Sequence, residues 1–240
     1  MARVRLNGDA CAGVVISDRI VASARHCAIE CPCFLRNETD WTKCQAICFI
    51  HLREFNDLVS DTETKHVIQS VKFPRNSGSH FRNETDFMLF ILAESVNSCS
   101  ADEQDRCWKI EPAKIADSDT VIRQGAEVRT LGWGATELSF TQIDQSKFPM
   151  EVKLKVDSSN LYKFKIETEV GPNGEDTCKG DSGGPLILLD SNFEQVVVAT
   201  LQGGGLANCL FFDAEDQNIP TGVWNKISRV DQCYNMRAHL

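Results

Sequence analysis

The chain has 240 residues, of which 42% are hydrophobic and 25% are charged. This composition is ordinary for a globular protein, and the length is enough for one large domain or two small ones. The formal net charge of −9 argues against nucleic acid as a partner, because non-specific nucleic-acid affinity comes from clustered Lys and Arg. No apolar run approaches the roughly 18 residues that a membrane-spanning helix needs, so we expect no membrane contact.

Patterns of short β-strands recur along the chain, with period-2 alternation as the commonest. In chain order, the predicted strands are residues 13–16, 48–53, 66–73, 87–92, 127–131, 151–156, 163–167, 186–189 and 196–200. Many short strands separated by polar turns favour an all-β barrel or sandwich. The polar residues 98–119 are predicted to separate two strand-rich halves, and residues 228–240 are predicted as a short helix.

Eleven cysteines are unusual for a cytosolic protein and indicate an oxidising compartment with several disulfides. The odd count leaves one thiol over. Two N-glycosylation sequons, at Asn37 and Asn83, fit exposed loops of a secreted glycoprotein. Residues 1–10, however, contain no apolar segment that could act as a secretory signal. We therefore expect an extracellular protein whose export signal is not in this sequence.

The string Gly180-Asp181-Ser182-Gly183-Gly184-Pro185 is the most specific in the chain. A serine between glycines can sit on a tight turn, where its Oγ is exposed and the N–H groups of Gly180 and Ser182 converge as an oxyanion hole. A serine hydroxyl is a poor nucleophile at neutral pH and needs a histidine as base, oriented by a carboxylate. The string therefore predicts an acyl-transfer site.

Candidates for both partners stand upstream. His26 follows an apolar stretch and precedes Cys27, and Asp86 heads a predicted strand. Each has an ordinary alternative, since an isolated histidine is usually structural and the aspartate could be a turn residue. The order His26, Asp86, Ser182 is nevertheless one of the known orders of a serine triad.

With these motifs the sequence resembles the trypsin and chymotrypsin family of serine endopeptidases, from Cys11 to about Ser228. The resemblance implies two six-stranded Greek-key β-barrels with a short C-terminal helix and an active site between the barrels. The barrels would be residues 1–106, lacking the first segment, and residues 121–240, joined by a linker at residues 107–120 in one peptidase domain.

The same resemblance implies peptide-bond hydrolysis through an acyl-enzyme, with His26, Asp86 and Ser182 as the triad and Gly180 with Ser182 as the oxyanion hole. It implies a monomer that acts on protein or peptide substrates and is bound by protein inhibitors. No cofactor and no metal are expected.

Asp176, six residues before the serine, resembles the floor of the primary specificity pocket, which implies cleavage after Arg or Lys. Its alternative is a solvated loop carboxylate. Gly222, Gly203 and Gly204 resemble the glycines of the pocket walls. Where relatives have Ser-Trp-Gly, we align Gln202 with the serine and Gly203 with the tryptophan, so the wall is altered.

The resemblance also implies disulfides Cys11–Cys27 and Cys178–Cys209, whereas Val128 and Leu188 replace a pair that many relatives have. Four further cysteines lie in an enlarged loop. Two local disulfides are favoured there over a zinc site, because the spacing is not a standard ligand spacing. These four are Cys31, Cys33, Cys44 and Cys48.

Relatives become active when a new N-terminal amine inserts beside the aspartate that precedes the serine, here Asp181. The chain has no Ile-Val-Gly-Gly-like start, so we expect a truncated sequence. An unpaired buried carboxylate costs about 3–5 kcal/mol, and we therefore expect Asp181 to relax outward and to disorder the oxyanion hole. The competing hypothesis is a zymogen-like or catalytically silent protease homologue that acts as a binding or regulatory module.

Overall fold

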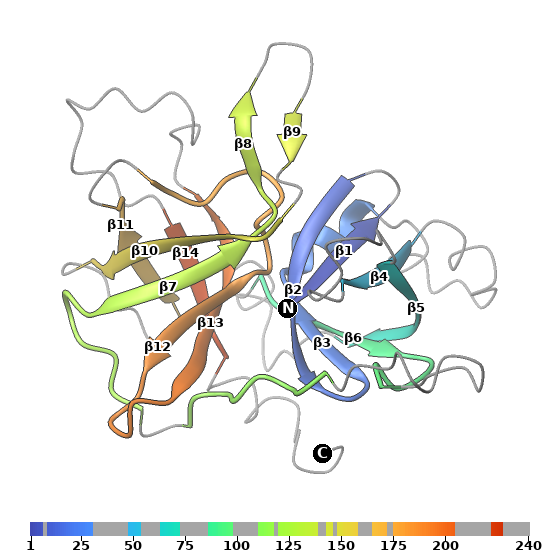
Figure 1. Cartoon of the computed structure of the whole chain (residues 1–240), viewed down its shortest axis with the longest axis horizontal. Helices are drawn as coiled ribbons and strands as arrows, with labels where there is room; N and C mark the ends of the chain where they lie inside the picture. Colours follow the sequence, from blue (N-terminus) through green and yellow to red (C-terminus); the bar gives the residue numbers. More distant parts are fainter. Residues whose placement is uncertain are drawn as a thin grey trace, which may run out of the picture.

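The computed structural model contains two closed antiparallel barrels of six strands each, which lie side by side (Figure 1). The expected all-β fold of two six-stranded barrels is confirmed. The structure describes residues 1–6, 9–30, 48–53, 63–72, 86–97, 110–117, 120–138, 143–145, 148–157, 165–171, 175–204 and 222–227.

The first barrel has the strand order β1-β2-β3-β6-β5-β4. Its strands are β1 (Ala2–Leu6), β2 (Asp9–Ser17), β3 (Ile20–Ser23), β4 (Cys48–Arg53), β5 (Glu63–Lys72) and β6 (Met88–Leu92), with the 3-10 helix η1 (Arg25–Glu30) after β3. Strand β1 closes this barrel, because Val4 pairs with Cys11 of β2 on one side and with Ile50 of β4 on the other.

The second barrel has the order β10-β11-β14-β13-β12-β7. Its strands are β7 (Glu127–Gly132), β10 (Met150–Val156), β11 (Lys165–Glu169), β12 (Pro185–Leu189), β13 (Gln195–Gly204) and β14 (Gly222–Lys226). A separate hairpin of β8 (Ala135–Leu138) and β9 (Ile143–Gln145) projects from the end of β7 (Figure 1). The part of the chain described here contains no helix that is long and apolar enough to cross a membrane.

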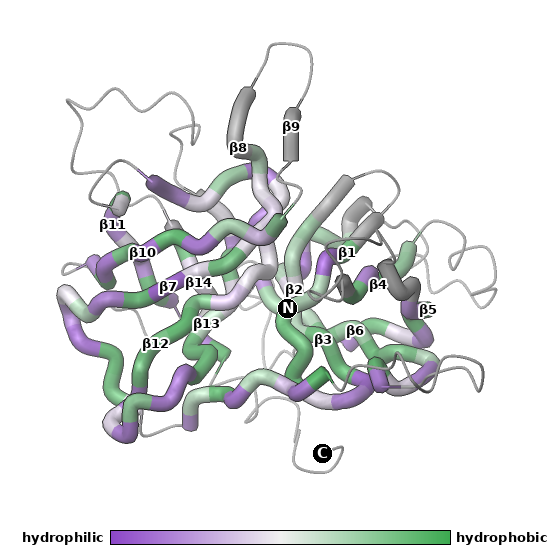
Figure 2. Tube along the Cα trace, in the orientation of Figure 1, coloured by the Kyte–Doolittle hydropathy of each residue, from purple (hydrophilic) through white to green (hydrophobic). Residues whose placement is uncertain are grey.

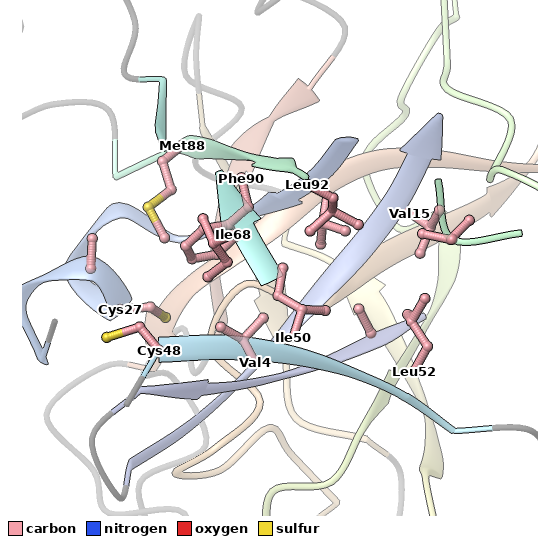
Figure 3. Close-up of a cluster of buried hydrophobic side chains, with 14 of the residues drawn as sticks. Val4, Val15, Cys27, Cys48, Ile50, Leu52, Ile68, Met88, Phe90 and Leu92 are labelled. Atoms are coloured by element: carbon pink, nitrogen blue, oxygen red, sulfur yellow. The ribbon is translucent and has the colours of Figure 1, made fainter. Parts of the chain in front are cut away.

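Successive residues of a strand point alternately into the barrel and out of it, and this alternation decides which side chains fill each barrel. In β10, Leu154 and Val156 are buried, whereas Lys153 and Lys155 are exposed. Figure 3 shows Val4, Ile50 and Phe90 converging in the interior of the first barrel. Figure 2 shows the same hydrophobic stretches running along the strands of both barrels.

Val128 and Leu188 both belong to the core cluster of the second barrel. The valine and the leucine that stand in place of the disulfide are therefore buried and packed. Neither position carries a thiol.

Several strands were not among those predicted. Strand β1 was missed because the segment of residues 2–6 is short and contains two arginines, and β14 was considered only for its glycine. The predicted helix at residues 228–240 lies outside the described residues. The predicted linker is partly described, and its Ile115 forms a parallel bridge with Val197 of the second barrel.

The first barrel buries one histidine whose protonation we expect to oppose folding. His66 pairs with Ile50, is 7% exposed, and its Nε2 has no hydrogen-bond partner within the described chain. Burial lowers the pKa of His66 below 6.5; nearby Glu94 raises it in part, and His51 lowers it further.

Because the folded state prefers neutral His66, this residue favours folding fully above pH 6.5 and progressively less as the pH falls below it. We predict that urea unfolding at about pH 5 and pH 8 shows a smaller acid-induced loss of stability in His66→Leu than in wild type. An equal loss in both proteins would contradict this account.

Candidate active site

The antiparallel pairing of β3 with β6 brings His26 to Asp86. Ser23, at the end of β3, is opposite Met88, at the start of β6, so the residues just beyond these two strand ends lie together. Asp86 Oδ2 lies 2.5 Å from His26 Nδ1, and Asp86 Oδ1 accepts a hydrogen bond of 2.7 Å from the His26 backbone N–H. One carboxylate thus holds both the ring and the backbone of the histidine. The His26 side chain remains 42% exposed.

A disulfide joins Cys11 of β2 to Cys27 of η1, as predicted. It fixes η1 against the barrel next to His26. Cys48 and Cys178 are also disulfide-bonded, to partners outside the described residues. Cys11, His26 and Cys27 are close enough to suggest a metal cluster, but the two sulfurs are bonded to each other and are not thiolate ligands.

The loop that carries Ser182 is held by hydrogen bonds within its own barrel. Gly184 N–H donates to Asp181 O at 2.8 Å, and Gly183 N–H donates to Leu201 O of β13 at 2.8 Å. Leu201 N–H in turn donates to Gly184 O at 2.9 Å. Gly180 and Gly183 have φ values of 104° and 83°, a left-handed conformation that side chains other than glycine rarely adopt.

The same loop docks onto the first barrel. Ala12 N–H donates to Ser182 O at 2.8 Å. A Cβ at Gly183 would lie 2.2 Å from Ser23 Oγ and 2.4 Å from Ala12 O, so only glycine fits this contact. Ser182 O also lies 3.9 Å from Cys27 Sγ, beside His26. The structure therefore brings Ser182 and the His26–Asp86 pair to one place where the barrels meet.

The two backbone N–H groups that flank Asp181 have no protein acceptor in the described part of the chain. These are the N–H groups of Gly180 and Ser182, whereas those of Cys178, Asp181, Gly183 and Gly184 are all engaged. Free N–H groups on either side of Asp181 can stabilise a negative oxygen that develops beside Ser182.

Asp181 differs from expectation, because it points inward rather than outward. Its Oδ1 accepts a hydrogen bond from Gly134 N–H at 2.7 Å, and its Oδ2 accepts one from Cys178 N–H at 2.9 Å. A Cβ on Gly132 would lie 1.7 Å from Oδ1, so the carboxylate fills space that only glycine leaves. Burial raises the pKa of Asp181, and the two N–H donors lower it in part. These donors are the physical reason that the carboxylate stays inside.

The residues expected to form the specificity pocket lie on β13, on β14 and in the loop before Cys178. Gly204 of β13 is directly opposite Gly222 of β14. A Cβ at Gly222 would lie 2.4 Å from Thr168 Oγ1, which accepts a hydrogen bond from buried Trp224 Nε1. Gly203 has no described atom within 4 Å of such a Cβ.

Asp176 is partly exposed, and its Oδ1 accepts a hydrogen bond of 2.7 Å from Thr177 N–H. Gln202 lies at the irregularity in β13, where its buried Oε1 has no hydrogen-bond partner among the described residues. The structure thus gives the altered wall a polar atom that is not satisfied by the protein.

Several predicted positions lie outside the described residues. They are Asn37, Asn83, Cys31, Cys33, Cys44 and Cys209. Conversely, sequence reasoning assigned no part in holding the serine loop to Ala12, Ser23 and Gly134, which contact it from distant parts of the chain. Nothing in their local sequence signals that role.

The chain is similar to known proteins over most of its length. Residues 1–211 match the family model described as Trypsin. Melanization protease 1 of Drosophila melanogaster is 25% identical over 77% of the chain and 48% of its own length, and mouse kallikrein-8 is 27% identical over 74% and 62%.

A similar solved structure is that of neuropsin, a serine protease expressed in the limbic system of mouse brain. It matches with a TM-score of 0.64 and 19% identity over 100% of this chain and 93% of its own, which is a likeness of fold. The chain spans about half the length of the first curated relatives, at 48% and 50%.

Two glycines allow a matched test of the contact between the barrels. Gly183 and Gly125 both have positive φ, but only Gly183 is crowded, since a Cβ at Gly125 meets nothing within 4 Å among the described residues. We predict that Gly183→Ala lowers the free energy of unfolding by about 2–5 kcal/mol, from backbone strain and overpacking. Gly125→Ala should cost about 1 kcal/mol, from strain alone. Equal losses in urea unfolding would show that the contact does not constrain the loop.

Proposed function

The chain belongs to the trypsin family, and from this premise we propose that it is a serine endopeptidase that uses Ser182, His26 and Asp86. The observation that carries the proposal is the docking of the Ser182 loop beside the His26–Asp86 pair, through the contact of Gly183 with Ser23. Nucleophile, base and orienting carboxylate need this proximity to act together.

In the proposed mechanism, Ser182 Oγ attacks the carbonyl carbon of the scissile peptide bond and His26 Nε2 accepts the hydroxyl proton. His26 then donates that proton to the leaving amine, which leaves an acyl-enzyme on Ser182. Water, deprotonated by His26, hydrolyses the acyl-enzyme and releases Ser182. The N–H groups of Gly180 and Ser182 stabilise the oxyanion of both tetrahedral intermediates.

Asp86 has two tasks in this scheme. Its bond to His26 Nδ1 keeps the proton on that nitrogen, so that Nε2 is the basic one. The hydrogen bond that it accepts from the His26 backbone N–H fixes the position of the backbone from which the imidazole ring extends. The negative charge also stabilises the imidazolium that forms during each proton transfer.

We further propose cleavage after Arg or Lys, with Asp176 as the anion that pairs with the substrate cation. Gly222, Gly204 and Gly203 would form the walls around the long side chain. The pairing of Gly204 with Gly222 across two adjacent strands supports this arrangement, because it brings two of the proposed wall glycines together.

We place the protein outside the cell, as a monomer that acts on protein or peptide substrates and is open to protein inhibitors. Asn37 and Asn83 would carry glycans, and Cys178 would pair with Cys209. The Cys11–Cys27 disulfide supports the location, since such bonds persist in oxidising compartments.

A second candidate is a latent or silent protease homologue that acts as a regulatory module. The specific observation in its favour is Asp181, which has no cationic partner in the part of the chain that the structure describes. Peptide hydrolysis separates the two candidates, because the silent module would not turn over.

We predict that Ser182→Ala lowers kcat for an Arg-containing fluorogenic peptide by about 10⁴- to 10⁶-fold, because the nucleophile is lost. Ser191→Ala, at an exposed serine on a turn, is the matched control and should leave kcat unchanged. Comparable activity in Ser182→Ala and wild type would refute the proposed mechanism.

Charge selectivity is tested by Asp176→Asn. Removing one partner of a desolvated ion pair costs at least about 2 kcal/mol, so kcat/KM for peptides cleaved after Arg should fall about 30-fold or more. Glu175→Gln, which neutralises the neighbouring exposed carboxylate, should have little effect. If both variants retain wild-type preference for Arg over Leu, Asp176 does not read the substrate charge.

A further inference from the structure

The turn between β12 and β13 carries an aromatic side chain where turn geometry favours glycine. The N–H of Phe193 donates to Asp190 O at 3.0 Å, and the N–H of Asp190 donates to Glu194 O at 2.9 Å. Phe193 has a φ of 61°, in the left-handed region. Hairpin loops that end in a left-handed residue of this kind usually place glycine there.

Phe193 is unfavourable here in two ways. A bulky side chain at positive φ is a genuine outlier, because Cβ crowds the backbone. The side chain is also 85% exposed, so its ring gains almost nothing from burial in this barrel. Folding of the chain alone therefore gives no reason for an aromatic residue at this position. Backbone strain of this sort is often found where a residue serves binding.

Hydrogen bonds and ion pairs tie the two sides of the turn together. Asp190 Oδ1 accepts hydrogen bonds from Asn192 N–H at 2.8 Å and from Glu194 N–H at 3.0 Å. Lys114, from the segment that joins the barrels, donates to the carboxylates of Asp190 and Glu194. A rigid turn presents its side chain to a partner without a large loss of conformational entropy on binding.

The surroundings of the ring define what would fit it. Leu189, the last residue of β12, is 50% exposed and adds a second apolar side chain to the turn. Two carboxylates, of Asp190 and Glu194, share the single ammonium of Lys114, which leaves a net negative charge beside the ring. A complementary surface is an apolar pocket with a cationic rim.

Size argues against a second copy of the chain as the partner. Two side chains bury a few hundred Å² at most, whereas a stable interface needs about 1,000 Å² or more. So small a contact gains in strength when the partner is also held elsewhere, because the second contact then forms within one complex. A bound substrate is held in this way at the active site.

The hairpin places both contacts on one rigid element. In the chain, Ser182 precedes the first residue of β12 and Phe193 follows the last. The five residues of β12 span about 17 Å at roughly 3.3 Å per residue. A folded protein is large enough to span this separation, whereas a short peptide in the active site is not.

We propose that Phe193, with Leu189, is an exosite that docks into an apolar, cation-rimmed pocket of folded protein substrates. The proposal rests on the proposed endopeptidase activity and adds a second recognition site to it. Docking at this exosite requires the pocket of the substrate to be intact, so unfolded substrates do not use the exosite.

The test compares wild type, Phe193→Gly and Phe193→Tyr on two probes. The first probe is a short fluorogenic peptide with Arg before the scissile bond. The second is extracellular fluid of the source organism, used native and after reduction and denaturation, with new N-termini quantified by mass spectrometry. Phe193→Gly suits the turn, so it should raise Tm by about 2–4 °C, which excludes misfolding as a cause of lost cleavage.

We expect all three proteins to cleave the peptide and the denatured proteins at equal rates. Phe193→Gly should cleave a subset of native proteins with kcat/KM at least about tenfold lower, and Phe193→Tyr, which keeps the ring, should restore it. Equal rates on every native protein, with normal peptide cleavage, would overturn the exosite and leave the proposed function standing. Absence of peptide cleavage in wild type would overturn both.

Discussion

Ser182 O accepts a hydrogen bond of 2.8 Å from Ala12 N–H, and its neighbour Gly183 has no side chain because Ser23 and the Ala12 carbonyl fill that space. Each barrel has its own core, and this contact lies beside a third apolar cluster in which Val14 and Leu89 of the first barrel pack with Val197 of the second. His26 and Asp86 belong to the first barrel and Ser182 to the second. The three side chains proposed as the triad come together where the barrels touch, so the position of Ser182 depends on a missing Cβ.

Within the second barrel, the same loop encloses a carboxylate. Asp181 lies between Gly132 and Gly134 and accepts N–H groups from Gly134 and Cys178. Burial of the charge is unfavourable and the two donors offset part of that cost, as the raised pKa of Asp181 reflects. With the side chain inside, the N–H groups of Gly180 and Ser182 on either side of it remain available. The order of the loop therefore depends on the Asp181 carboxylate, which accepts these hydrogen bonds.

Local pattern was sufficient to predict much of the fold. Residues 48–53 were predicted as a strand with the bounds that the structure gives, because alternating side chains there face a core and solvent. Strand β1 was missed because its pattern is short. Asp181 was wrongly expected to turn outward, since the donor in Gly134 lies 47 positions away and no local pattern reveals it. The Cys11–Cys27 pairing, inferred by resemblance, is confirmed, whereas the roles of the triad remain predictions.

We propose that Ser182 is a nucleophile activated by His26. A fluorophosphonate reacts with a serine only when a base and an oxyanion hole assist it, so the most direct measurement is stoichiometric labelling read by intact mass and peptide mapping. The account predicts one phosphonyl group per chain, on Ser182, and none in a folded His26→Ala variant. A folded wild-type protein that stays unlabelled, or that is labelled at another residue, would contradict it.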